Sequence, residues 1–229
     1  MVTINSIAGG APKPVFDRLG PIYERQSSNK LNALYDTMSG IQARLAKHDA
    51  LDVLLMPVSM LDDLKKAGTV LAQGRATLAV IGLGVGVKTG AKLPDISTPD
   101  AFRAALSGAR AIVHAPPAAT PSGAQSDKVI KELGLADKVP VIHKAGLAGG
   151  VAAIASGEAE FGIFPKSEIF AFDGVTLIGS LPPALQLNIV YGAAVTTASA
   201  VADPAAAFIQ FLISPDSRKV WNACGFDEP

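Results

Sequence analysis

The chain has 229 residues, of which 49% are hydrophobic, and its 20 basic residues balance its 20 acidic residues. This composition is typical of a compact globular protein with one large domain or two small lobes, and it excludes a disordered chain. The absence of a basic excess argues against nucleic acid or an anionic membrane surface as a partner. We therefore expect any anion site to depend on local donors.

The sequence also argues against several kinds of site and segment. The single cysteine, Cys224, cannot form an intramolecular disulfide, and the three histidines have no metal-ligand spacing, so we expect neither a metal nor another cofactor. No apolar run reaches the roughly 18 residues of a transmembrane helix, so no membrane insertion is expected. No signal-peptide pattern is visible. The chain as it stands would be cytoplasmic, and a signal replaced by Met1 would make it periplasmic.

Strands and helices alternate through the first part of the chain. The apolar run 2–8 predicts a buried strand, and the apolar spacing within 14–25 predicts a helix. Further strands are predicted at 30–35 and 52–56, and further helices at 41–47 and 59–67, with Thr37 and Ser39 as candidate N-caps. This alternation indicates a mostly parallel sheet covered by helices.

The junction between the first strand and the first helix carries Gly9, Gly10 and two prolines. Glycine permits close approach to the backbone, and proline is preset for a first helical turn. A helix start without a capping side chain offers free N–H groups and a positive dipole end, which suit an anion. Lys13 follows directly and adds a positive charge to the candidate site.

Two long apolar strands are predicted at 77–87 and 187–195. We interpret them as strands that cross between two lobes, because the glycines of the first one do not have the spacing of a dinucleotide-binding motif. Tyr191, on the second crossing strand, either packs in the core or reaches a ligand with its hydroxyl.

A second series of units lies between the crossing strands. Strands are predicted at 111–114, 139–142, 160–164 and 175–179, and helices at 98–106, 124–133 and 146–156. Ser122 is the expected N-cap of the helix at 124–133, and Thr120, Ser122 and Gly123 are candidate ligand contacts. Helices are also predicted at 202–213 and from 214 to 221.

Several segments resemble one known family in both order and spacing. They are GGAPKPVF, TMSGIQARLA, DVLLMPVSMLDDLKKAG, ATPSG, GEAEFGIFPKSEI and AAAFIQFLISPDSRKVWNACGF. Over nearly its whole length the chain resembles the periplasmic molybdate-binding proteins, which are two-lobed solute-binding proteins of type II topology. The resemblance implies an α/β fold in which each lobe is a mostly parallel sheet flanked by helices. Lobe one would comprise 1–80 with 190–229, and lobe two 81–189, with two hinge strands.

The same resemblance implies a small anion in a cleft that closes by hinge motion. Four helix starts would face that cleft, near Gly10, Ser39, Ser122 and Leu147. The family's molybdate site uses serine hydroxyls after the first two strands, backbone amides of lobe two and a tyrosine. Here the corresponding positions hold Gly10 for the first serine, Thr37, Met38 or Ser39 for the second, and Pro165 for the tyrosine.

Two polar donors of that molybdate site are thus missing, and Lys13 adds a charge. A carboxylate gains more from a fixed positive charge than an oxyanion held by neutral donors does. The sequence therefore favours an organic carboxylate over molybdate.

The resulting hypothesis is a monomeric solute-binding protein that performs no chemistry and docks an ABC permease. The alternative is an enzyme similar to aconitate isomerase, which moves a double bond in a tricarboxylate by proton transfer. His114, His143 or Lys13 would then be the candidate base, and no glutamate stands out at a strand end. A third option is a cytoplasmic ligand sensor.

Overall fold

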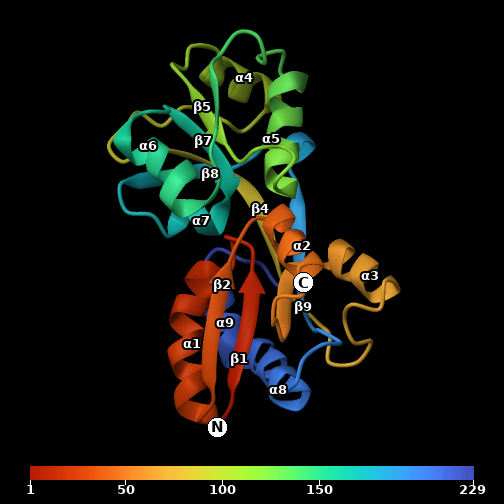
Figure 1. The fold of residues 1–229 in the computed structure, drawn as a ribbon. Helices are drawn as coiled ribbons and strands as arrows, with labels where there is room; N and C mark the ends of the chain where they lie inside the picture. The colour runs from red at the N-terminus through yellow and green to blue at the C-terminus, as the bar shows by residue number, and fades with distance from the viewer. The chain divides into compact units, whose positions relative to one another are not determined.

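A computed structural model describes residues 1–229, which form two compact units. Unit 1 comprises Met1–Ile81 and Ile189–Pro229, and unit 2 comprises Gly82–Asn188. The chain leaves unit 1 within β4 (Ala76–Lys88) and returns at the start of β9 (Asn188–Val195). Each unit is a sheet with helices packed around it, so the predicted α/β class is confirmed (Figure 1).

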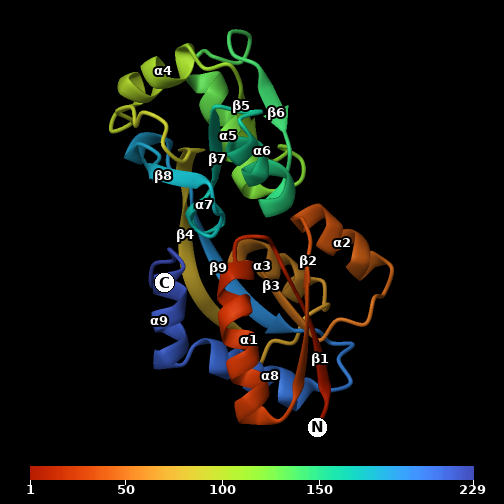
Figure 2. The same ribbon diagram turned by 90° about the vertical axis from the view of Figure 1, so that its left-hand side faces the viewer.

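The sheet of unit 1 has the strand order β2-β1-β3-β9-β4. Three strands are parallel, namely β1 (Thr3–Ala8), β2 (Lys30–Tyr35) and β3 (Val53–Pro57), and β9 runs antiparallel to β3. The helices are α1 (Lys13–Ser27), α2 (Met38–Ala46), α3 (Val58–Lys66), α8 (Ala202–Leu212) and α9 (Pro215–Ala223). Figure 2 shows α1, α8 and α9 beside one another, and all three pairs are in contact.

The sheet of unit 2 is built around β5 (Ile112–His114). This strand runs parallel to β6 (Val141–His143) and to β7 (Phe161–Pro165), while β4 runs antiparallel to β7 and to β8 (Val175–Ser180). The helical segments are α4 (Pro99–Ser107), α5 (Pro121–Glu132), the π-helix η1 (Gly146–Val151), α6 (Ala152–Ser156), α7 (Lys166–Phe170) and the 3-10 helix η2 (Pro183–Leu185).

Each unit has an apolar core of its own. Every residue of β3 is buried, as expected for a strand covered on both faces. In unit 1, Phe208 packs its ring edge-on against Phe16 at 5.8 Å, and Trp221 packs edge-on against Phe226 at 4.9 Å. In unit 2, two clusters of buried side chains form the core, one including Phe102 and the other including Phe164.

Two helices begin three residues earlier than predicted, and one short helix was not predicted. Helix α2 begins at Met38 and not at Ile41, and α5 begins at Pro121 and not at Ala124. In both cases a threonine that precedes the helix is the N-cap, so the helix starts directly after it. The short helix α7 was not predicted, because five residues are too few to show a helical period.

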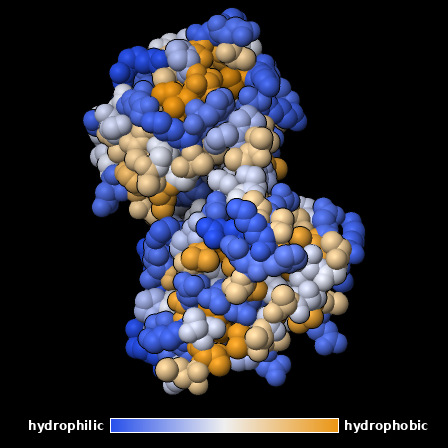
Figure 3. Space-filling model, in the orientation of Figure 1, coloured by the Kyte–Doolittle hydropathy of each residue, from blue (hydrophilic) through white to orange (hydrophobic).

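The surface carries few large apolar side chains. Those that are exposed belong to Met1, Leu93, Phe170 and Val190. Hydrophobic patches lie among hydrophilic residues on the faces of both units that Figure 3 shows. No helix combines the length and the apolar character that crossing a membrane requires.

Asp52 joins three separate segments of unit 1. Its Oδ2 accepts the backbone N–H of Asn5 at 2.8 Å, and its Oδ1 accepts the hydroxyl of Ser199 at 2.6 Å. Only 7% of the residue is exposed, so these donors would lose their acceptor in a largely dry environment if the carboxylate were removed.

We therefore expect Asp52→Ala to lower the free energy of unfolding by about 2–3 kcal/mol, because it leaves two donors without an acceptor. Asp52→Asn keeps one carbonyl oxygen as an acceptor and should cost less. Urea denaturation of the two variants checks this order, and equal losses would show that the carboxylate is not the shared acceptor.

Candidate functional site

The same four-residue turn begins one helix in each unit. Thr37–Gly40 opens α2 and Thr120–Gly123 opens α5, and both have the sequence Thr-x-Ser-Gly. We call them the cap turns. Each lies after a parallel strand, β2 in unit 1 and β5 in unit 2, at the carboxyl end where ligands bind in α/β sheets. Sequence reasoning missed this repeat, although the shared Thr-x-Ser-Gly pattern marks it.

The two cap turns share one hydrogen-bond pattern. In unit 1 the Thr37 hydroxyl oxygen accepts the N–H of Gly40 at 3.1 Å, and in unit 2 the Thr120 oxygen accepts the N–H of Gly123 at 2.9 Å. The threonine and serine hydroxyls of each turn lie 3.1 Å apart in unit 1 and 3.0 Å apart in unit 2. Two hydroxyl protons are present per turn and one suffices for the bond between the hydroxyls, so the other is available to a ligand.

The structure corrects the predicted cap of α5. Thr120 caps the helix, and Ser122 lies inside its first turn, where only 7% of it is exposed. Pro121 occupies the first helical position, which favours a cap at the residue before it. In unit 1 the predicted cap Thr37 is confirmed, and Ser39 is exposed in the first turn.

In each cap turn another group lies close to the glycine backbone, and this group differs between the two turns. A methyl group at Gly123 would lie 2.5 Å from the carbonyl oxygens of both Ala115 and Pro116. At Gly40 it would overlap the carboxylate of Asp36. That carboxylate accepts the N–H of Thr37 at 2.8 Å and pairs with Arg44 at 3.1 Å. A paired negative charge therefore adjoins the cap turn of unit 1, and backbone carbonyls adjoin that of unit 2.

The Tyr191 hydroxyl lies close to Gly9, in the turn that follows β1. A methyl group at Gly9 would lie 3.1 Å from the Tyr191 hydroxyl and 2.7 Å from the Met38 side chain. Tyr191 is 5% exposed and its ring packs edge-on against Phe226 at 6.3 Å. Three sequence-predicted positions of unit 1, in the first turn, the cap turn and β9, are therefore neighbours.

The start of α1 offers fewer free N–H groups than the sequence predicted. No side chain caps this helix, as expected, but the N–H of Lys13 bonds to the carbonyl of Gly10 at 3.0 Å. Pro12 and Pro14 have no N–H to offer. The prolines that preset the turn therefore also remove donors from it.

Lys13 has a partner within its own helix. Its ammonium contacts both carboxylate oxygens of Asp17, at 2.7 and 2.9 Å, and lies 5.4 Å from the centre of the Tyr35 ring. Its side chain is 39% exposed. The charge that the sequence assigned to the anion site is thus balanced by Asp17 in this structure.

Leu147 lies in η1, which follows β6 in unit 2. Ala145 precedes this π-helix, and no side chain caps it. Gly150 is required here, because a methyl group would lie 2.5 Å from the Lys144 carbonyl and would overlap the Phe164 ring. Because η1 has no capping side chain, the backbone N–H groups of its first turn have no side-chain acceptor.

The two histidines proposed as bases are neighbours on adjacent strands. His114 pairs in register with His143, and the ring centres lie 4.8 Å apart. His114 is fully buried, and burial lowers its pKa below the usual value. Its Nδ1 lies 2.8 Å from the Ala115 carbonyl, while Nε2 has no partner. A neutral, fully buried ring packs as a core residue.

Sequence reasoning missed Glu168, which lies in α7 directly after β7. The residue is 6% exposed, and burial raises its pKa from about 4.5 to about 7. Burial is the sole cause of this shift, without a contribution from any charge or hydrogen bond. No sequence pattern marks a buried glutamate three residues after a strand.

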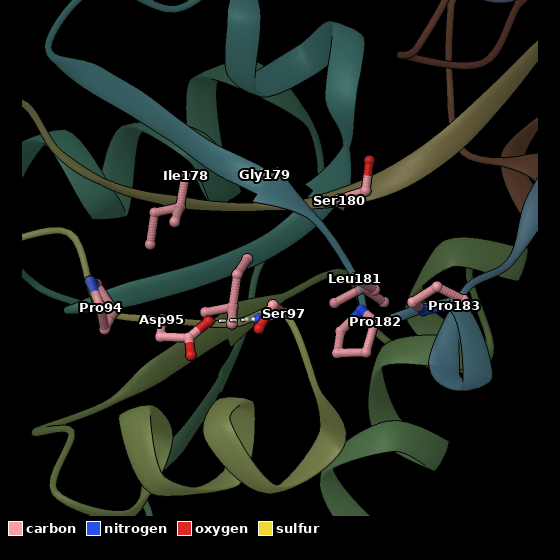
Figure 4. Close-up of a pocket in the computed structure, with 10 residues that line it drawn as sticks. Pro94, Asp95, Ser97, Ile178, Gly179, Ser180, Leu181, Pro182 and Pro183 are labelled. Carbon is pink, nitrogen blue, oxygen red and sulfur yellow. Dashed lines mark hydrogen bonds between the residues drawn. The ribbon is translucent and has the colours of Figure 1, made fainter.

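One surface pocket of unit 2, with a volume of about 470 Å³, lies apart from these residues. It is formed by the loop before α4 and by the end of β8 and the residues after it (Figure 4). Its lining is largely proline and aliphatic, with Ser97 and Ser180 and a single charged residue, Asp95, whose carboxylate accepts the Ser97 N–H at 2.8 Å. An acidic lining without basic residues does not suit an anion.

Comparisons with known proteins identify relatives along the whole chain. The family model described as bacterial extracellular solute-binding protein matches residues 4–227. An aconitate isomerase from a Pseudomonas species is 30% identical over 98% of this chain and 87% of its own length.

Solved structures show the same fold at low identity. The periplasmic molybdate-binding protein of Azotobacter vinelandii has a TM-score of 0.83 and 20% identity, covering 99% of both chains. A sulfate-binding protein of Mycobacterium tuberculosis has a TM-score of 0.79 and 17% identity, covering 99% of this chain and 86% of its own. The type II periplasmic binding protein fold expected from the sequence is thereby confirmed.

The raised pKa of Glu168 predicts how stability depends on pH. Because the folded state holds this proton more tightly than the unfolded state, stability falls as pH rises from about 4.5 to about 7. The pKa difference corresponds to about 3 kcal/mol. We expect Glu168→Gln, which cannot ionise, to raise the free energy of unfolding at pH 8 by up to that amount.

At pH 4.5 the same substitution should change stability little, because Glu168 is then protonated in the folded state. Urea denaturation of both proteins at the two pH values measures the difference. A gain at pH 8 that equals the change at pH 4.5 would contradict the raised pKa.

Proposed function

The chain belongs to the bacterial extracellular solute-binding proteins, and on that basis we propose that it binds a small organic carboxylate through the cap turns of both units. The observation that carries this proposal is the repeat of the cap turn, once in each unit, after a parallel strand. Each turn supplies hydroxyl donors at a helix start, where the partial positive charge of the helix favours an anion.

The donors of this site are neutral. In unit 1 they are the hydroxyls of Thr37 and Ser39 with the adjoining N–H groups of the first turn of α2, and Tyr191 near Gly9 adds a third hydroxyl. In unit 2 they are the hydroxyls of Thr120 and Ser122 with the uncapped start of η1 near Leu147. Hydrogen bonds to a charged acceptor contribute about 1.5–3 kcal/mol each, so several are needed for micromolar binding.

In this proposal the ligand is held by both units at once. Ligand contacts from both sides would favour a closed state over an open one, and the two chain crossings in β4 and β9 would be the hinge. The closed form would deliver its ligand to an ABC permease. Lys13 would contribute a charge only where the ligand replaces Asp17 as its partner.

A carboxylate is favoured over a tetrahedral oxyanion for two reasons. The relative that is 30% identical is an aconitate isomerase, whose name specifies a tricarboxylate. Gly10 and Pro165 stand where the family's molybdate site has a serine and a tyrosine, so two oxyanion donors are missing.

We expect Ser122→Ala and Ser39→Ala each to weaken binding of tricarballylate, a saturated tricarboxylate, by roughly tenfold or more through loss of one hydroxyl donor. Isothermal titration calorimetry measures the affinities. Ser107→Ala, in α4, removes an exposed hydroxyl that bonds to the Arg103 carbonyl, and it should leave binding unchanged.

Thermal-shift assays with molybdate, sulfate, succinate and tricarballylate test the ligand class. Stabilisation by tricarballylate or succinate supports the proposal. Stabilisation at micromolar concentration by molybdate or sulfate alone would show that the ligand is a tetrahedral oxyanion and not a carboxylate.

The second candidate is an isomerase that acts on a tricarboxylate by proton transfer. The aconitate isomerase relative favours it, and so does Glu168, whose pKa of about 7 suits a group that takes and returns a proton at neutral pH. The reaction moves one proton and one double bond, so it needs no oxidant or reductant.

Nuclear magnetic resonance distinguishes the two candidates. The protein is mixed with cis-aconitate in D2O at pH 7. Binding without chemistry leaves the cis-aconitate signals unchanged. Formation of trans-aconitate with deuterium incorporation, abolished in Glu168→Gln, would establish the isomerase.

A further inference from the structure

No charge or hydrogen bond offsets the burial of the Glu168 carboxyl group. The residue is 6% exposed, and burial alone determines its shifted titration. A carboxylate in such a place loses much of its hydration, and it avoids this cost when it holds its proton.

The elements packed against α7 within unit 2 explain why Glu168 has no compensating charge. These elements are β4, β7, β8 and η1, and the only titratable residue among them is Lys88, which is exposed at the end of β4. The charged residues nearby in the chain are Lys166 on α7 itself, Asp173 after it, Glu160 before β7 and Lys144 before η1. Lys144 pairs with Glu158 at 2.7 Å, and Glu160 accepts the N–H of Arg110 at 3.1 Å.

The topology places Glu168 at the same edge of the sheet as the cap turn of unit 2. Strands β6 and β7 both run parallel to β5. The segments that follow these three strands therefore leave the sheet at one edge. They are the cap turn Thr120–Gly123 after β5, η1 after β6 and α7 after β7, and α7 packs against η1.

We propose that Glu168 is held in its protonated form as a hydrogen-bond donor to the bound anion, so that each ligand binds together with one proton. This inference rests on the proposed function. A protonated carboxyl has one O–H donor, whereas an ionised carboxylate only accepts and would repel an anion. Burial keeps such acids neutral at the pH where they must donate.

Glu168 lies in the first turn of α7, three residues after Pro165 ends β7. As a neutral carboxylic acid it supplies one O–H donor at that place. The proton comes from solvent and returns there on release, so no other reactant takes part.

The affinity of the whole protein for tricarballylate, measured by calorimetry, tests this role. This probe cannot isomerise and is fully ionised from about pH 7.5 to 9. Over that range we expect the affinity to fall by up to tenfold per pH unit, because the free protein must take up a proton to bind. Titrations at pH 8 in two buffers of different ionisation enthalpy should show uptake of close to one proton per ligand.

Two variants separate donation from a structural role. Glu168→Gln keeps an N–H donor and cannot ionise, so its affinity should stay constant with pH and its proton uptake should vanish. Glu168→Leu is neutral but cannot donate, and at pH 7.5 it should bind roughly tenfold more weakly than Glu168→Gln. Glu132→Gln, near the end of α5, should keep the pH dependence of the unmodified protein. Thermal unfolding confirms that each variant is folded.

The outcomes are distinguishable. The role of Glu168 would be overturned if binding remained pH-dependent in Glu168→Gln, or if the Gln and Leu variants bound with equal affinity. Either result would leave the proposed function intact. Failure of the unmodified protein to bind any carboxylate at any pH would refute the proposed function, and this inference with it.

Discussion

The hydrogen bond from a glycine N–H to the hydroxyl of a threonine three residues earlier is the interaction on which both cap turns depend. It fixes the start of α2 in unit 1 and of α5 in unit 2, and with it the position of a serine hydroxyl on each first turn. The cap uses the oxygen of the threonine as an acceptor and leaves hydroxyl protons to donate. A chain with 20 basic and 20 acidic residues thereby has neutral hydroxyl donors at two helix starts without any charge excess.

The two cap turns differ in what surrounds them. In unit 1 the Asp36 carboxylate, paired with Arg44, lies over the glycine, whereas in unit 2 the carbonyls of Ala115 and Pro116 do so. In unit 1 the Tyr191 hydroxyl also lies close to Gly9 and Met38, which adjoin the cap turn. The two cap turns are therefore alike in their hydrogen bonds and unlike in the groups that adjoin them.

Local sequence patterns predicted much of the fold, including the alternation of strands and helices and the N-cap Thr37. Two predictions failed where a local signal received too little weight, and a third failed where long-range packing decides. Ser122 was taken for a cap because the helix period is visible only from Ala124, although Pro121 marks the first helical position. Lys13 was assigned to the site by its place in the chain, but its contact with Asp17 depends on the helix that both share. The burial of Glu168 depends on β8 and η1, which no local pattern brings together.

The stability of the fold does not explain why a glutamate occupies position 168. An acid whose burial no charge or hydrogen bond offsets opposes folding at neutral pH, and a glutamine of the same size would not. Sequences generally agree with their folds at every level, and exceptions occur mainly at functional sites. His114, by contrast, is buried in its neutral form, where burial costs far less. The two residues thus represent different cases: the histidine leaves one neutral ring nitrogen without a partner, and the glutamate is accounted for by a ligand that uses its proton.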